Sequence, residues 1–98
     1  PESYDEKTVI KKWKEETPDL LEELKNKLEP LIDFSSENIE KEFKAYLLEK
    51  EIGMGRLLPA FRLSLTGLGM GPSLFEIATL LGKKEVIDRM ENAIKNIK

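Results

Sequence analysis

Apolar residues recur every three or four positions along nearly the whole chain, which is the period of a helix with one buried face. The first such segment opens at Ser3, where the spacing S-x-x-E matches a capping box, and runs through Trp13. The second opens with Thr17 as N-cap and Pro18 at the first helical position, and it should end near Pro30, since a proline inside a helix removes a hydrogen bond. The pattern predicts a helix in each segment.

The middle of the chain carries two further helical segments. The third helix is expected to begin at Ser35 or Ser36 and to end at Gly53, a residue that adopts the left-handed conformation easily. The fourth runs from about residue 56 to residue 66, which places Pro59 in its first turn, where a helix tolerates proline. We expect Gly67 to close it.

The last third of the chain begins with a loop and ends with two helices. Three glycines and a proline within residues 67–72 are typical of a loop. A second S-x-x-E box, Ser73 to Glu76, opens the fifth helix, which Gly82 ends, and residues 84 to about 97 form the sixth. The expected core residues are Trp13, Leu24, Phe43, Leu65, Phe75 and Ile87.

The elements together predict an all-α fold. Leucine occurs fifteen times and valine only twice among 98 residues, a composition that favours helix over strand. A chain of this length supports one core. We therefore expect residues 1–98 to form one domain, a single bundle of about six helices without a convincing strand.

Charge divides this domain into two parts. Residues 1–53 hold nine lysines against fifteen acidic residues, a net charge of −6, whereas residues 54–98 have a net charge of +3 and hold all three arginines. The first part, 1–52, reads as acidic helices and the second, 53–98, as a helix–loop–helix part. A nucleic-acid partner would therefore be expected to touch residues 54–98.

The composition excludes several kinds of chemistry. The chain has no histidine and no cysteine, so a histidine base, a thiolate nucleophile and a zinc site built on either residue are absent. Carboxylate pairs such as Glu37 and Glu40 lie opposite the apolar stripes and read as solvated surface. We therefore expect no catalytic residue and no metal site. We also expect no membrane span, because no run of about 20 apolar residues is free of charges and helix breakers.

The glycine loop is the main candidate for binding. Pro72 stands where a dinucleotide-binding G-x-G-x-x-G motif needs its last glycine, so the loop is not that motif. A loop low in charge beside Arg62 could instead present amides and a guanidinium to unstacked bases. The alternative is a plain helical hairpin in which Arg62 pairs with Glu76. Trp13 could also stack on a base, but a tryptophan on an apolar helix face more often belongs to a core.

Two motifs carry a resemblance to a known family. The run G-R-L-L-P-A-F-R-L-S-L-T-G (55–67) and the run G-P-S-L-F-E-I-A-T-L-L-G-K-K-E-V-I-D-R-M (71–90) resemble the C-terminal domain of bacterial glutamyl-tRNA synthetases. In that family the pattern is close to P-x-R-x-A-L-T-G, a short loop, P-x-x-F-E and L-G-K-E; Ser64 stands here in place of the alanine. The resemblance implies an all-helical anticodon-binding domain of a class I aminoacyl-tRNA synthetase.

The resemblance also implies a partner and a set of contact residues. The partner is the anticodon loop of tRNA-Glu, not DNA. The implied RNA-binding residues are Arg62, Leu68, Gly69, Met70, Gly71, Pro72 and Leu74.

The remaining expectations concern the parent enzyme. The class I signatures H-I-G-H and K-M-S-K-S are missing, and the chain starts at Pro1, so we expect a piece from the C-terminus of a longer cytoplasmic ligase. ATP, L-glutamate and Mg²⁺ would belong to that parent, which attaches glutamate to tRNA-Glu in translation, and this piece would hold no cofactor. The alternative function is a helical protein-interaction domain with an apolar groove at 54–82.

Overall fold

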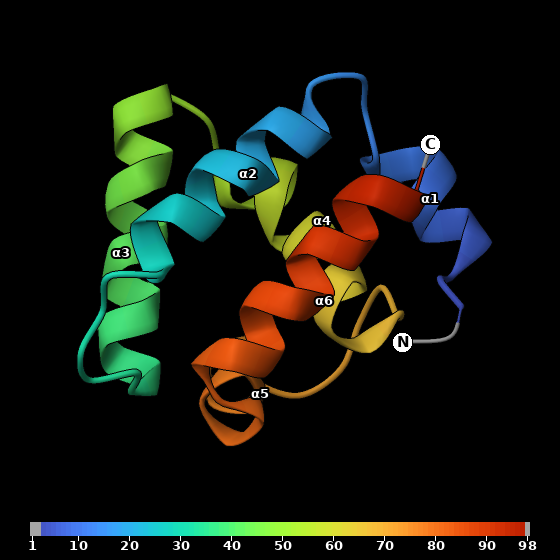
Figure 1. Ribbon diagram of the computed structural model, residues 1–98. Helices are drawn as coiled ribbons and strands as arrows, with labels where there is room; N and C mark the ends of the chain where they lie inside the picture. The colour runs from blue at the N-terminus through green and yellow to red at the C-terminus, as the bar shows by residue number, and fades with distance from the viewer. Residues whose placement is uncertain (1–2, 98) are drawn as a thin grey trace.

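The computed structural model describes residues 3–97, and within this range it contains six α-helices and no strand. The helices are α1 (Glu6–Lys12), α2 (Thr17–Leu28), α3 (Ser36–Lys50), α4 (Met54–Thr66), α5 (Leu74–Leu81) and α6 (Lys83–Asn96). Figure 1 shows α3 and α1 at opposite ends of the molecule, with α4 between them and α5 below. The predicted six-helix, all-α bundle is confirmed.

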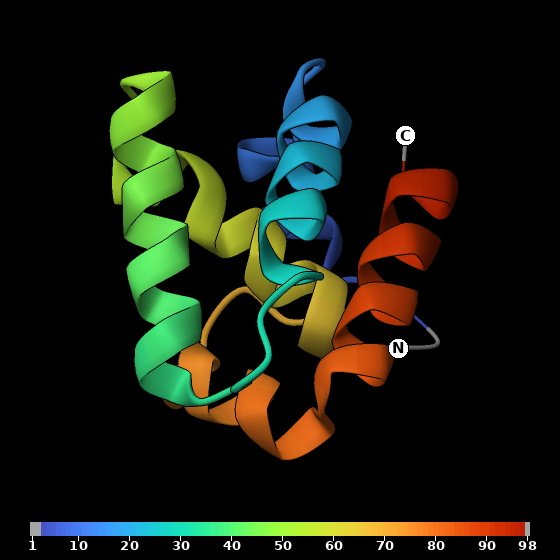
Figure 2. The same cartoon turned by 60° about the vertical axis from the view of Figure 1, so that its left-hand side comes forward.

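Helix α4 occupies the centre of the bundle. It packs against α1, α2 and α6, while α3 packs against α2 and α5. Figure 2 shows α2, α3 and α6 standing side by side around α4, with α5 across their lower end. This order follows from the apolar residues of α4, of which Leu57, Phe61 and Leu65 are fully buried.

The core contains five of the six side chains predicted for it. Phe43 lies at its centre, with its ring centroid 5.7 Å from that of Phe61 and 5.6 Å from that of Phe75. Trp13 is buried, which confirms its core assignment, and Phe75 is only partly buried at the edge of the cluster. The other predicted core residues, Leu24, Leu65 and Ile87, are buried.

The start of α1 differs from the prediction. Asp5, not Ser3, is the N-cap: its carboxylate accepts hydrogen bonds from the Thr8 amide at 3.0 Å and from the Thr8 hydroxyl at 2.6 Å. The predicted capping box at Ser3 is therefore wrong. Asp5 is the N-cap because aspartate caps helices as well as serine does, and its carboxylate here accepts from two donors on the same residue.

The start of α2 also differs from the prediction, whereas its end agrees with it. Glu16 precedes the helix, and the Thr17 hydroxyl accepts from the Lys14 amide at 2.8 Å instead of capping the first turn. Thr17 is fully buried and also accepts from Arg56 at 3.1 Å, so it ties α2 to α4. The helix ends at Leu28, as Pro30 predicted.

The connection between α3 and α4 corrects two predictions. Ser35 caps α3 as expected, but Glu51, with φ 56°, takes the left-handed position that we assigned to Gly53. The amides of Glu51 and Ile52 bond the last turn of α3, and these hydrogen bonds offset the cost of a non-glycine residue in that conformation. Gly53, with φ −87°, is instead the N-cap residue that precedes α4.

Because α4 starts at Met54, Pro59 lies inside the helix and not in its first turn. The prediction for this proline was wrong. A proline at this position leaves the Gly55 carbonyl without its helical donor, but Gly55 is exposed, so water can bond to it. Gly67 closes α4 with φ 78°, as predicted.

The last two helices are separated by one residue. Ser73 precedes α5 as expected, but its side chain makes no capping hydrogen bond, so the predicted capping box is not formed. Gly82, with φ 87°, ends α5, and α6 begins directly after it at Lys83. No helix among residues 3–97 is long and apolar enough to cross a membrane.

Candidate functional site

The candidate site is the loop of residues 67–73, which joins α4 to α5. Thr66 shapes its first turn, since its hydroxyl donates to the Arg62 carbonyl at 2.9 Å and accepts from the Leu68 amide at 3.1 Å. The Gly67 carbonyl then accepts from the Asp5 amide at 2.7 Å. The loop is thereby tied to α4 and to the chain just before α1.

Arg62 holds the far end of the loop. Its Nη1 donates to the Pro72 carbonyl at 2.9 Å. A Cβ added at Gly71 would lie 3.2 Å from the same Nη1, so the glycine lets the guanidinium lie against the backbone. This one bond uses only part of the guanidinium, which carries further N–H donors in the same plane.

The ion pair between Arg62 and Glu76, the structural alternative, does not occur within residues 3–97. Arg62 is partly exposed and makes its contact with the loop carbonyl instead. Its structural role is therefore to position the loop, and the unused donors remain available to a ligand.

The middle of the loop presses against α1. A Cβ added at Gly69 would overlap the Thr8 hydroxyl and lie 3.2 Å from Cβ and Cγ2 of Thr8. Only glycine permits this approach without a shift of the loop or of α1. Gly69 thus links the loop to a helix far away in the sequence.

The loop residues named in the sequence prediction differ in exposure. The Leu68 and Met70 side chains are 58% and 81% exposed, and Gly71 and Pro72 are exposed as well. Leu74 is only 2% exposed and belongs to the core, so its side chain is not available to a ligand. The structure brings all seven predicted residues together in space, and their role in RNA binding remains a prediction.

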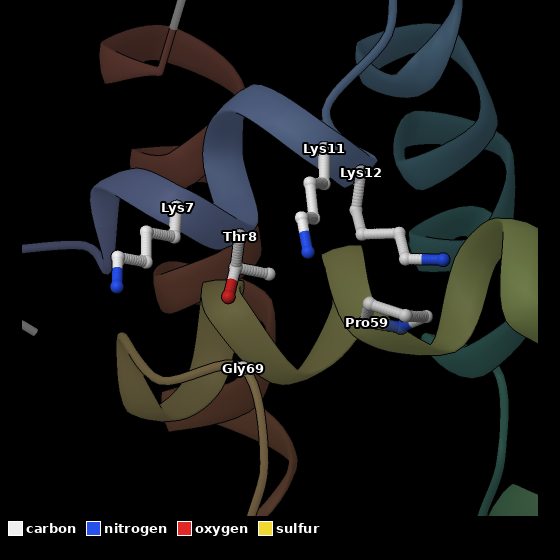
Figure 3. Close-up of a pocket in the computed structure, with 6 residues that line it drawn as sticks. All are labelled: Lys7, Thr8, Lys11, Lys12, Pro59 and Gly69. Atoms are coloured by element: carbon white, nitrogen blue, oxygen red, sulfur yellow. The ribbon is translucent and has the colours of Figure 1, made fainter.

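A group of lysines on α1 lies next to this loop. Lys7, Lys11 and Lys12, together with Thr8, Pro59 and Gly69, line a hollow of about 180 Å³. In Figure 3 all three lysine side chains reach from α1 toward the side on which Pro59 and Gly69 lie. The hollow therefore joins the first helix of the acidic part to the loop of the second part.

An acidic side chain beside this region, that of Asp5, is already hydrogen-bonded within the fold. Asp5, which lines a second hollow with Thr8, Leu68, Gly69 and Met70, bonds Thr8 through its carboxylate. The hydrogen bonds from the Thr8 side chain and amide hold the pKa of the Asp5 carboxyl below its ordinary value. Within residues 3–97, no three His, Cys, Asp or Glu side chains come together to hold a metal ion.

The α1 lysines were missed by reasoning from the sequence. The net charge of −6 over residues 1–53 concealed a local run, K-T-V-I-K-K-W-K at 7–14, with four lysines and no acidic residue. A charge count over a window of one helix would have found it. Its position beside the loop could not have been found in this way, because it depends on the packing of α1 against α4.

Comparison with known proteins links this geometry to a family. The model of a family described as "Anticodon binding domain" matches residues 1–94. A glutamate–tRNA ligase of Flavobacterium psychrophilum is 50% identical over 97 residues, which is 99% of this chain and 19% of the relative. A second, from Phocaeicola vulgatus, is 43% identical over 98 residues.

Solved structures give the same picture. A glutamate tRNA ligase from Elizabethkingia meningosepticum, in complex with its amino acid, superposes with a TM-score of 0.95 at 38% identity, over 100% of this chain and 19% of that protein. A glutamate-tRNA synthetase from Elizabethkingia anophelis gives 0.84 at 34% identity, over 98% of this chain and 18% of that protein. The chain thus spans about a fifth of the length of the relatives it matches.

Proposed function

Since the chain belongs to the anticodon-binding domain family, we propose that it binds the anticodon loop of tRNA-Glu as one part of a glutamate–tRNA ligase. The rest of that ligase would be its second partner. Attachment of glutamate to the tRNA, with ATP, L-glutamate and Mg²⁺, would take place in the remaining four fifths of the enzyme, and the setting would be cytoplasmic translation. DNA and membranes are not proposed as partners.

The observation that carries the proposal is the fixed loop beside Arg62. Proteins read single-stranded RNA by stacking on splayed bases and bonding their edges. The guanidinium of Arg62 can stack on a base through its planar face, or it can bond a base edge with the N–H donors that Pro72 leaves unused. Leu68 and Met70 add exposed apolar surface against which a base can pack.

The start of α5 adds donors to the same place. The amides of its first turn have no helical acceptor, and Ser73 provides no side-chain cap for them. The first of these amides, that of Leu74, lies two residues after Pro72, whose carbonyl accepts from Arg62. A base carbonyl or a phosphate that contacts Arg62 would thus find further donors close by.

The alternative, a protein-interaction domain with an apolar groove at 54–82, finds little support. The apolar residues of α4 that would line such a groove are fully buried in the core: Leu57, Ala60, Phe61, Leu63 and Leu65. Among residues 54–82 the large exposed apolar side chains are Leu68, Met70 and Leu80. Three separate side chains do not make a groove for a helix.

Titration of the 98-residue chain with a tRNA-Glu anticodon stem–loop tests the proposal. The control RNA keeps the stem and replaces the three anticodon bases. We expect binding that weakens as salt is raised, because counterions are released on binding, and a preference of about tenfold or more for the tRNA-Glu loop. Equal affinity for both loops, or no binding to either, would contradict the proposal.

A further inference from the structure

Among residues 3–97, more than half of the Lys and Arg side chains outside α1 are paired with carboxylates, and those of α1 are not. Among residues 3–97, seven Lys and Arg side chains form ion pairs with carboxylates: Lys25, Lys27, Lys44, Lys50, Arg56, Lys84 and Arg89. Lys83 instead bonds the carbonyls of Glu29 and Leu31 at the end of α2. Lys7, Lys11 and Lys12 of α1 and Lys14, which follows it, have no such partner among the described residues, and neither do Lys41 of α3 and Lys95 of α6.

The α1 lysines share one side of their helix. Each residue turns an α-helix by about 100°, which places Lys7, Thr8, Lys11 and Lys12 within about 140° of one another. The same rotation places Glu6 nearly opposite the middle of this group. The lysines therefore face the loop without a carboxylate of α1 between them.

Neighbouring acidic groups are occupied in the fold. The Asp5 carboxylate accepts both hydrogen bonds of Thr8, and Glu16 binds Arg56 at 2.6 Å. Like charges at adjacent turns of one helix repel. Structural needs therefore do not explain the lysines, and an anionic partner would relieve their repulsion.

The hollow between these lysines and the loop has a volume that suits a short piece of RNA backbone. Its volume of about 180 Å³ would hold roughly six water molecules. That is less than the roughly 300–1,000 Å³ of pockets that enclose small molecules. It does suit a phosphate group with part of a ribose, supplied by a strand that continues beyond the hollow on both sides.

We propose that Lys7, Lys11 and Lys12 form a phosphate-binding surface that holds the RNA backbone while Arg62 and the loop contact its bases. The inference rests on the proposed function, and it extends the RNA-binding surface onto the first, acidic part of the chain. Lysine suits this task, because its compact ammonium group binds phosphate as a point charge without reading sequence. The contact between Gly69 and Thr8 keeps the lysines and the loop close together, so one RNA strand can touch both.

The test compares two double variants that change the net charge equally. Lys7→Gln/Lys11→Gln removes two lysines of the proposed surface. Lys41→Gln/Lys44→Gln removes two exposed lysines from α3, at the opposite end of the molecule. For each protein, the affinity for the tRNA-Glu anticodon stem–loop and for the loop with replaced anticodon is measured over a series of salt concentrations.

We expect Lys7→Gln/Lys11→Gln to weaken both RNAs by about 5- to 20-fold near 0.1 M salt, and to make the plot of log affinity against log salt less steep by about 1.4. The ratio between the two RNAs should stay the same, since phosphate contacts carry no sequence information. The α3 variant should change the affinity less than twofold.

Two outcomes would overturn the inference, and they differ in what they say of the proposed function. If the unaltered chain prefers the tRNA-Glu loop but both double variants behave alike, only the lysine surface is wrong. If the unaltered chain binds neither RNA, the proposed function fails together with the inference. A variant whose melting curve differs from that of the unaltered chain is replaced by the single change Lys11→Gln, judged by the same salt slope.

Discussion

The face formed by α2 and α3 and the face formed by α1 and the loop use their charged residues in opposite ways. On the α2–α3 face, Lys27 pairs with Glu49 and Lys50 pairs with Glu23, both at 3.2 Å. The buried Tyr46 phenol donates to the same Glu23 carboxylate at 2.7 Å. These charged side chains of the α2–α3 face are satisfied within the protein.

On the α1–loop face, uncharged contacts hold the structure together. The Asp5 amide donates to the Gly67 carbonyl, and Gly69 lies against Thr8. Lysines stand beside these contacts without carboxylate partners among residues 3–97. The comparison shows where the protein can gain from binding a polyanion: cations that the fold has already neutralised add little to such binding, and unpaired ones add most.

The largest expected effect lies in the core that anchors α3. Phe43→Ala should lower the free energy of unfolding by about 3–5 kcal/mol, because the ring is fully buried between Phe61 and Phe75 and leaves a cavity. Urea denaturation measures the change. Phe75→Ala is the matched control, and its partly exposed ring should cost clearly less. An equal cost for the two variants would show that α3 is not anchored chiefly by Phe43.

Arg62 tests whether the loop serves binding more than stability. Arg62→Ala should weaken binding of the tRNA-Glu anticodon stem–loop by about 1–3 kcal/mol. The free energy of unfolding should fall by about 1 kcal/mol at most, since one hydrogen bond to the Pro72 carbonyl is lost. RNA titration and thermal unfolding are measured on the same samples.

Arg62→Lys separates charge from shape at this position. Lysine keeps the charge but loses the planar fork, so we expect it to restore the salt dependence of binding while the preference for the correct anticodon stays weak. Unchanged RNA affinity in Arg62→Ala, together with a lowered melting temperature, would assign Arg62 to loop structure alone.

The contact between the loop and α1 should break when a side chain is added to Gly69. Gly69→Ala should cost about 1–2 kcal/mol of stability, because its Cβ would overlap the Thr8 hydroxyl. In a Thr8→Ala background, where that hydroxyl is missing, the same change should cost less than half as much. Additive effects of the two substitutions, measured by urea denaturation, would argue against the contact.

The smallest effect concerns the satisfied charges of the α2–α3 face. Hydrogen bonds from Tyr46 and then Lys50 hold the pKa of the Glu23 carboxyl below its ordinary value of 4.5. A lowered folded-state pKa stabilises the protein above the unfolded pKa, and this stabilisation is lost as pH falls through the folded value. Tyr46→Phe should therefore be less stable than the unaltered chain near pH 6.

The difference between Tyr46→Phe and the unaltered chain should shrink as the pH falls below about 4. Unfolding curves at several pH values measure it. The Lys44→Gln variant, which breaks the exposed pair with Glu40 on the outside of α3, is the control. A pH-independent difference for Tyr46→Phe would mean that the phenol acts through packing and not through Glu23.

Local signals predicted the helices well where one residue decides the outcome. Ser35 caps α3, Gly67 and Gly82 end their helices, and α2 stops just before Pro30. Local signals failed where neighbours competed or packing intervened. Asp5, which accepts from two donors on Thr8, is the N-cap of α1 in place of Ser3. Glu51, whose amide bonds the last turn of α3, takes the left-handed position in place of Gly53.

The sequence by itself determined the helical period, the six elements, the burial of Trp13 and Phe43, and the motif that relates the chain to anticodon-binding domains. These depend on the order of residues within a few turns of the chain. Only the tertiary structure decided that Arg62 holds Pro72 instead of Glu76, that Leu74 is buried, and that the α1 lysines lie beside the loop. The physical reason is that the helix packed next to a charged side chain decides whether that charge is paired. For the α1 lysines this neighbour is the loop, which lies some sixty residues away in the chain.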